Sequence, residues 1–575
     1  MTEQQQASNN FLVTVEGQAL PADVAKAMVI AVVDCSVALP DAFSLTFRDP
    51  ARSVLADGKF SIGAKVKISV SSAADPGKPL LSGEVTALEA EHDPGGTYTI
   101  VRGYDQSHRL LRGRRTETYT DVTYADVAKR VAQLAGLTPG MIDSTTTTHP
   151  HVAQGNQADW DFLWGLAREV GYEVAVAEGK LNFRKPVSAD GGPAAGTLTS
   201  SNPLQLALGT NLLSFRAVVT AAEQVNQVQV RGWDVAQKRS VVGVAAAAAG
   251  SAELSLTPKD VATTFAAPPY IGVDVPYRTQ AEVDTAAKAV AEQIGGAFAE
   301  FEGVARGNPA LKAGSAISLA LVGAPFDGKY TLSAVRHLYD SVTGYTTAIT
   351  VSGRQQRSLL GLVNGGRRAS GNPGSLPGVA PAQVTDVHDP DDMGRVKVKF
   401  PWLSDTYVSD WVRVVCIGAG ANRGGIWLPE VNDEVLVTFE QGDLRRPYVL
   451  GGLHNGVDRP KLGDGLVDAS SGAVTRRGFV SKKGNSLLFF DDDMDNGVAI
   501  LTGDSKLRLS LNGGTSTIRI SSNGKVEIDG DGDISIKAGG NLTLQAQAKL
   551  ALSGAQVSIS GSGPVEVSGT PIKLN

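Results

Sequence analysis

Near its C-terminus the chain reads Lys525-Val-Glu-Ile-Asp-Gly-Asp-Gly-Asp-Ile-Ser-Ile-Lys-Ala-Gly-Gly540. Two apolar residues flank one polar residue, glycine or aspartate follows, and the unit returns after about eight residues. The alternation places both apolar side chains on one face of a strand, and glycine permits the tight corner between strands. Eight such pairs occur in chain order: Ile518 and Ile520, Val526 and Ile528, Ile534 and Ile536, Leu542 and Leu544, Leu550 and Leu552, Val557 and Ile559, Val565 and Val567, and Ile572 and Leu574.

This repeat predicts a β-solenoid over residues 485–575. Eight residues are too few for one chain to close a three-sided turn around its own core. Three interwound chains can do so together, with the paired residues on a common axis and few open sheet edges along the sides. We therefore expect an intertwined trimeric β-helix, a homotrimer, with the paired residues as its axis. The alternative is a two-sided roll made by one chain, but the Gly-Gly-X-Gly-X-Asp series of calcium-binding rolls is absent.

A second strand-rich segment, residues 382–456, predicts an OB-fold barrel. It holds five short alternating strands separated by turn residues: 383–387, 394–400, 410–415, 433–439 and 447–450. OB barrels often bind oligonucleotides, but Trp402, Trp411 and Trp427 are not embedded in an excess of Lys or Arg. The formal net charge of −6 also gives no basic footprint, so nucleic acid is not an expected partner.

Residues 1–370 mix alternating strands with a few helices. Helices are predicted over 123–136, 158–170 and 279–294, and the first and third open with a Thr-X-X-acid capping box. A hairpin turn is predicted at Glu178-Gly179. Polar, Gly-rich stretches at 371–381 and 457–484 are typical of linkers. The fold class is therefore mainly β and multidomain.

No catalytic, cofactor or metal site is predicted. His149-Pro-His151 could direct two imidazoles to one side of an extended segment, but no third ligand is near in sequence, so we expect a surface turn. Asp491-Asp-Asp-Met-Asp495 begins like a calcium loop, yet Asn496 stands at the glycine position and Thr502 at the position of the bidentate glutamate. A polar hairpin turn is the expected structure there.

The chain has no apolar signal core at its polar N-terminus and no run of about twenty apolar residues. Cys35 and Cys416 lie far apart and give no disulfide framework. We therefore expect synthesis in the cytoplasm without a signal peptide.

The barrel segment carries an ordered series of motifs: Gly394-Arg-Val-Lys-Val398, Phe400-Pro-Trp402, Trp411-Val-Arg413, Leu428-Pro-Glu-Val431, Asp433-Glu-Val-Leu-Val437, Glu440-Gln-Gly-Asp443 and Arg446-Pro447. With this series the chain resembles the VgrG family and the related spike proteins of contractile phage tails and extracellular contractile injection systems. The first region resembles the baseplate-hub domain of that family less tightly. The residues concerned are Arg102-Gly-Tyr-Asp105, His108-Arg109, Trp160-Asp-Phe-Leu163, Arg168-Glu169, Gly171-Tyr172, Phe326-Asp-Gly-Lys-Tyr330 and Val335-Arg-His337.

The resemblance implies a hub in which three chains each contribute two similar barrels to a ring under the tail tube. It implies tail tube and baseplate proteins as partners, effector cargo, and transient contact with a target membrane or cell wall. A PAAR-type tip protein would meet the last four residues, Ile572, Lys573, Leu574 and Asn575. Some related spikes bind iron through paired histidines near the tip, but no histidine follows His454 in this chain.

Two other functions stay open at this point. A tail-associated peptidoglycan hydrolase would need a carboxylate-bearing domain, and only about thirty residues, 453–484, separate barrel and spike. A receptor-binding tailspike or adhesin would expose aromatic grooves, and no Trp, Tyr or Phe follows Phe490. The sequence favours a structural protein rather than an enzyme. It leaves open whether the machine is a type VI apparatus, an extracellular particle or a phage, and the lack of an effector extension favours the last two.

Overall fold

The structure is a computed structural model that describes residues 10–72, 75–194, 202–353, 376–462, 465–492 and 496–573. The chain divides into two compact units, Met1–Asn455 and Gly456–Asn575. The first unit contains the predicted hub region together with the barrel, and the second contains the predicted spike. Leu574, Asn575 and residues 371–375 of the predicted linker at 371–381 lie outside the described residues.

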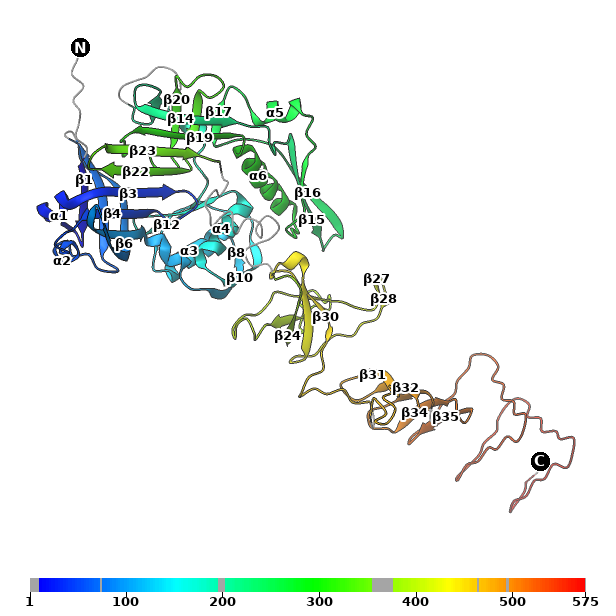
Figure 1. The fold of residues 1–575 in the computed structure, drawn as a ribbon. Helices are drawn as coiled ribbons and strands as arrows, with labels where there is room; N and C mark the ends of the chain where they lie inside the picture. The colour runs from blue at the N-terminus through cyan, green and yellow to red at the C-terminus, as the bar shows by residue number, and fades with distance from the viewer. Residues whose placement is uncertain are drawn as a thin grey trace, which may run out of the picture. The chain divides into compact units, whose positions relative to one another are not determined.

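The hub region is built on one eleven-stranded sheet in the order β14-β19-β23-β22-β3-β4-β7-β6-β5-β1-β2 (Figure 1). Antiparallel pairing of β3 with β22, from Ser36 opposite Ala334 to Ile30 opposite Asp340, joins strands from the two ends of the region. Two separate apolar cores pack against the sheet, one on the N-terminal strands and one on the C-terminal strands. The strands are β1 Asn10–Val15, β2 Gln18–Ala19, β3 Met28–Ser36, β4 Ala42–Arg48, β5 Lys65–Ser72, β6 Asp75–Asp93, β7 Gly96–Asp105, β14 Leu212–Val219, β19 Ala299–Arg306, β22 Ala334–Asp340 and β23 Gly344–Val351.

The three predicted hub helices are confirmed as α3 (Tyr124–Leu134), α4 (Asp159–Val170) and α6 (Gln280–Gly296). Thr123 and Thr279 close capping boxes with the acidic residue three positions later, which satisfies backbone donors at each helix start. Gly171 ends α4 in the left-handed region, with φ of 74°, where a side chain would be strained. The predicted hairpin at Glu178-Gly179 is also present, between β11 (Glu173–Ala177) and β12 (Lys180–Arg184).

Smaller elements complete the hub. β8 (Arg115–Val122) and β10 (His149–Gln157) form an antiparallel pair, and a third apolar core joins them to α3 and α4. α6 packs closely on β16 (Arg239–Ala246), where a Cβ on Gly243 would come within 2.1 Å of the Val283 carbonyl oxygen. The remaining elements are α1 Ala22–Ala27, α2 Val54–Asp57, η1 Gln106–Leu111, β9 Thr138–Ile142, η2 Ala189–Gly191, β13 Gln205–Ala207, β15 Gln227–Asp234, β17 Ala252–Leu254, α5 Pro258–Thr264, β18 Tyr270–Gly272, β20 Ala316–Ala320 and β21 Gly328–Thr331.

The barrel sheet has the order β25-β24-β29-β30-β26. Its five strands overlap the five predicted segments, although β24 begins four residues earlier and β30 ends two residues later than predicted: β24 Val379–Asp386, β25 Lys397–Lys399, β26 Arg413–Val414, β29 Glu434–Phe439 and β30 Pro447–Gly452. Alternate residues such as Val384, Val398 and Val437 are fully buried around Phe400, as the alternation requires. A separate hairpin, β27 (Ala419–Gly420) and β28 (Arg423–Gly424), projects from the barrel (Figure 1).

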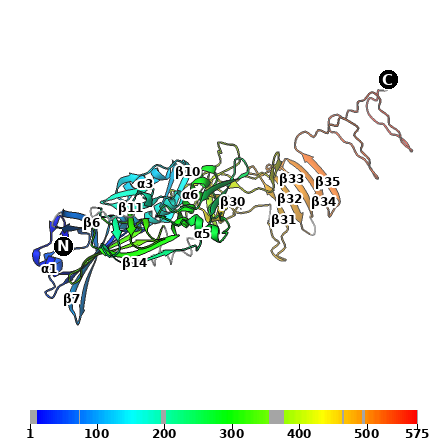
Figure 2. The same ribbon diagram turned by 90° about the horizontal axis from the view of Figure 1, so that it is seen from above.

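The second unit begins with a five-stranded antiparallel meander whose strands lie side by side in both views (Figures 1 and 2). Its strands are β31 Arg476–Val480, β32 Ser486–Asp491, β33 Asn496–Leu501, β34 Leu507–Asn512 and β35 Thr517–Ser522. β31 lies inside the segment predicted as a linker, 457–484, so that boundary needs correction. β31 lacks the apolar pairs of the repeat, and only its pairing with β32 defines it as a strand.

The predicted calcium-like stretch ends β32 and leads into β33, with Asp491 paired opposite Asn496. Residues 493–495 lie outside the described residues. The expected hairpin at this place is therefore confirmed by the strands on either side of it.

Candidate functional site: the joint between hub and barrel, and the apolar pairs of the second unit

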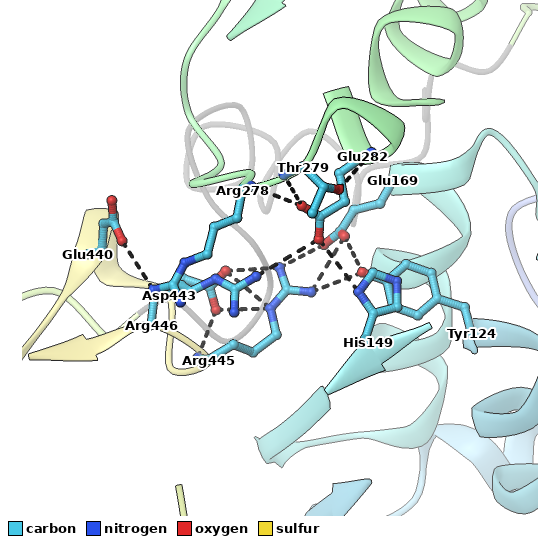
Figure 3. A network of polar contacts seen from close by, with 10 residues as sticks. All are labelled: Tyr124, His149, Glu169, Arg278, Thr279, Glu282, Glu440, Asp443, Arg445 and Arg446. Atoms are coloured by element: carbon cyan, nitrogen blue, oxygen red, sulfur yellow. Dashed lines mark hydrogen bonds and ion pairs between the residues drawn. The ribbon is translucent and has the colours of Figure 1, made fainter. Parts of the chain in front are cut away.

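A buried arginine of the barrel reaches into the hub within the first unit (Figure 3). Nη2 of Arg445 lies 2.8 Å from Oδ2 of Asp443 on its own loop and 3.0 Å from Oε1 of Glu169 on α4. Its Nη1 donates to the Tyr124 hydroxyl at 3.1 Å, and that hydroxyl donates to Glu169 at 2.5 Å. Burial works to lower the pKa of Arg445, but Asp443 and Glu169 outweigh it and hold the pKa well above its ordinary value. This cation is therefore permanent, and its charge is balanced from both domains.

A second set of contacts surrounds Glu282 at the start of α6 (Figure 3). Its carboxylate accepts hydrogen bonds from the backbone N–H groups of Arg278, at 2.8 Å, and Thr279, at 2.9 Å. Burial works to raise the pKa of Glu282, but these N–H groups and Arg446 outweigh it and lower the pKa. The nearest approach of Arg446 to Glu282 is 3.9 Å, which makes it the looser of the two arginines.

The two histidines of β10 also face the barrel. The His149 ring stacks on Tyr124 with centroids 4.2 Å apart and an interplanar angle of 6°. The His151 Nε2 lies 3.1 Å from the carbonyl oxygen of Val408 in the barrel, and because a carbonyl only accepts, Nε2 carries the proton. Both rings are buried, so the expectation of a surface turn is wrong. They do lie on one side of an extended segment. Tyr407 and Val408 of the barrel contact His151, and Arg445 and Arg446 of the barrel lie near His149.

Apolar packing adds to the polar joint. Ala153 of β10 belongs to the barrel core, and Leu444 of the barrel is buried beside Gly155. A Cβ at position 155 would lie 2.4 Å from Cδ2 of Leu444, so a larger residue there would require this side chain to shift. The joint thus combines a small interlocking contact with neutralised buried charges, which favours one orientation of the two domains.

A cavity of about 280 Å³ borders Tyr124, His149, Glu169, Glu282 and Arg445, whose charged groups already pair with one another. Over the parts of the chain that the structure describes, no group of three or more His, Cys, Asp or Glu residues could hold a metal ion. Among the same residues, no helix is long and apolar enough to cross a membrane. The joint is suited to holding two domains in a fixed orientation.

The predicted axis residues lie in the second unit. Ile518 and Ile520 are on β35, and the later pairs lie in residues 523–573, which form no strand paired within the described chain. Their exposed fractions run from 47% at Ile572 to 73% at Ile518 and Ile559. Lys573 is exposed as well, whereas Leu574 and Asn575 lie outside the described residues. The structure therefore leaves these apolar side chains uncovered by their own chain.

The joint itself was not predicted from the sequence, although some of its residues stand in the motifs quoted above. Glu169, Asp443 and Arg446 belong to motifs that carry the family resemblance, and the structure brings all three together. Arg445 and Tyr124 were missed, although a pair of arginines directly after an acidic turn is a signal for a buried ion pair. Arg445 and Glu169 are 276 positions apart in the sequence, and no local pattern predicts a contact of this range.

Comparison with known proteins agrees with the resemblance. A family model described as a type VI secretion system and phage-baseplate injector OB domain matches residues 380–454. The type VI secretion system spike protein VgrG2a of Pseudomonas aeruginosa is 38% identical over 74 residues, 12% of this chain and 9% of that protein. VgrG3 of Vibrio cholerae is 34% identical over 106 residues, 18% of this chain and 10% of that protein. The matched stretch thus spans about a tenth of the length of these curated relatives.

Among solved structures, a chain of the Francisella PdpA-VgrG complex superimposes with a TM-score of 0.53 at 10% identity. The superposition covers 90% of this chain and 88% of that one. At this identity the likeness concerns the fold, and it confirms the mainly β, multidomain class with an OB barrel. The predicted resemblance to spike and hub proteins of phage-like injection systems is likewise confirmed. A further family model, described as the Alg8 N-terminal domain, matches residues 7–340, and since this is more than half of the chain, the protein belongs to that family.

Proposed function

We propose that this protein is the structural spike and hub of a contractile, phage-tail-like injection machine and works as a homotrimer. The hub joins the spike to the tail tube and baseplate. The joint around Arg445 holds the barrel against the hub while force passes along the chain. The second unit forms a stiff shaft that carries the puncturing tip. This role needs rigidity and binding, and no chemical step.

The observation that carries the proposal is the uncovered array of apolar pairs. Fifteen of the sixteen paired residues lie in the described chain, and each of them is at least 47% exposed. Leaving so many Ile, Leu and Val side chains in water is costly, at about 1.5–3 kcal/mol per residue that could instead be buried fully. Three copies that wind around one axis would bury all of them and pair the backbone groups of residues 523–573.

The partners follow from the same proposal. A PAAR-type protein caps the flat end formed by Ile572, Lys573, Leu574 and Asn575. Tail tube and baseplate proteins contact the hub, and effector cargo travels with the spike. The Francisella complex, in which a VgrG chain is bound to PdpA, supports a further protein carried on the spike. The assembled particle meets a target membrane or cell wall only during injection.

Multi-angle light scattering on the full chain tests the proposal directly. We expect a mass three times the 59.8 kDa of one chain. Limited proteolysis of the same sample should leave a resistant fragment that contains residues 523–573. A monomeric mass with that fragment still resistant would point to a roll made by one chain and would overturn the intertwined shaft.

A further inference from the structure

A two-stranded arm leaves the barrel between Val415 and Leu428 (Figure 1). Ala419 pairs with Gly424 and Gly420 with Arg423, and Gly425 N–H donates to the carbonyl of Ile417 at 3.0 Å. Within the described residues, no third strand joins this pair. An isolated two-stranded hairpin is marginally stable in water, so an ordered arm of this kind needs a surface to lie on.

The base of the arm is apolar and uncovered. Ile417 is 84% exposed and Ile426 is 80% exposed, whereas Val412 and Val449 in the barrel itself are almost fully buried. Val415 and Trp427 are also more than half exposed. Side chains exposed to this extent bury little apolar surface against their own barrel. Grouped apolar exposure of this kind marks an interaction surface.

Charge indicates what kind of surface the arm fits. Residues 415–428 contain one charged side chain, Arg423, and no acid. The rest of the barrel, 379–414 and 429–455, holds six Lys or Arg and eleven Asp or Glu, a net charge of 6 − 11 = −5. Among the described residues, the exposed carboxylates of Asp392 and Asp405 have no hydrogen-bond or ion-pair partner. A basic, apolar arm is therefore complementary to a barrel such as its own.

We propose that the arm is a clasp between chains: residues 415–428 of one copy lie across the acidic barrel of a second copy. The inference rests on the proposed homotrimer and adds an interface that the axis of the shaft does not supply. In that trimer each barrel is tethered beside two others by the shaft of its own chain, which raises the effective concentration of the partner surface. The apolar base supplies contact area, and Arg423 supplies orientation.

Photo-crosslinking in the full-length protein tests the clasp. Ile426 is replaced by p-benzoyl-phenylalanine, and trimers are assembled from a mixture of ¹⁴N- and ¹⁵N-labelled chains. We expect cross-linked peptides that join a light to a heavy chain and map to residues 379–455 of the second copy. The same probe at Val342, an equally exposed hub residue, is the matched control and should give no cross-link to that barrel segment.

A charge reversal sharpens the test. Arg423→Glu places an acid at the tip of the arm, and we expect the yield of the cross-link between chains to fall at least about threefold at low salt. Trimers that give only cross-links within one chain, or cross-links to none, overturn the clasp and leave the trimeric shaft intact. A monomeric wild-type protein overturns the shaft and the clasp together. An unchanged yield with Arg423→Glu overturns the role of charge in the contact.

Discussion

The barrel and the shaft share one local pattern and differ completely in burial. Both alternate apolar with polar residues along extended segments. In the barrel, Val398 and Val437 are fully buried, whereas in the shaft Ile534 is 57% and Ile536 is 66% exposed. The barrel strands find partners within the chain, as β24 does along β29, whereas in the part of the chain that the structure describes residues 524–573 form no paired strand.

This difference shows what an alternation of apolar and polar residues can predict and what it cannot. It identifies an extended segment and the face that must be covered, but not which chain does the covering. The two regions also differ in their corners, because Gly, Asn or Asp stands between most of the apolar pairs of the repeat. Substitutions in the two regions can therefore distinguish a core that one chain completes from a core that needs further chains.

The largest effect is expected at the centre of the shaft. In the proposed trimer, Ile536→Asp would place three carboxylates on the common axis, each with a desolvation penalty of several kcal/mol. We expect loss of the trimer by light scattering and rapid proteolysis of the shaft, with the barrel still folded. Ser535→Asp, one position away on the opposite face of the strand, is the matched control and should remain trimeric. A trimeric Ile536→Asp variant of unchanged thermal stability would contradict the assignment of the axis.

In the first unit the largest effect is expected at Arg445. Arg445→Met leaves Asp443 and Glu169 buried without their shared cation, and we expect a loss of about 3–5 kcal/mol in unfolding free energy by urea titration. Arg446→Met is the comparison, because its nearest carboxylate oxygen is 3.9 Å away, beyond hydrogen-bond distance, and we expect a smaller loss. Equal losses for the two variants would show that Arg445 does not anchor the joint.

Features that depend on residues close together in the sequence can be predicted from it, whereas features that depend on distant residues cannot. Thr123, Thr279 and Gly171 define helix ends through contacts only a few residues long, and they were predicted correctly. The barrel strands were predicted too, because each carries its own alternation. The burial of His149 and His151 was not, since the barrel surface that covers them lies more than 250 positions away. The same holds for β31, which is defined by its neighbour β32 rather than by its own composition.

A smaller effect is expected where the barrel interlocks with the hub. Gly155→Ala forces Leu444 to move, because the added Cβ would lie 2.4 Å from its Cδ2. Overpacking of this kind costs about 1–3 kcal/mol, measured as a fall in the urea midpoint. Gly451→Ala in β30, where no atom lies within 4 Å of an added Cβ, is the matched control. If the loss comes from this contact, then Gly155→Ala combined with Leu444→Ala should lose less than the sum of the two changes.

The smallest effect is a dependence of the joint on pH. Burial lowers the pKa of both His149 and His151, against the carboxylates of Glu282 and Asp410, which work to raise them. Arg445 and Arg446 face both rings from the barrel and add to the lowering. The unfolded state, with an ordinary histidine pKa near ~6.5, therefore binds more protons than the folded state.

The free energy of unfolding should therefore be highest above about pH 7 and should fall as the pH drops through about 6.5 and below. Urea titrations of the wild type and of His149→Gln combined with His151→Gln measure the contribution, and the double variant should show a shallower slope over this interval. A double variant with the wild-type slope would mean that the buried rings titrate as free histidines do, and that the barrel does not shield them from water. In that case the contact between barrel and hub would be looser than the burial of the two rings indicates.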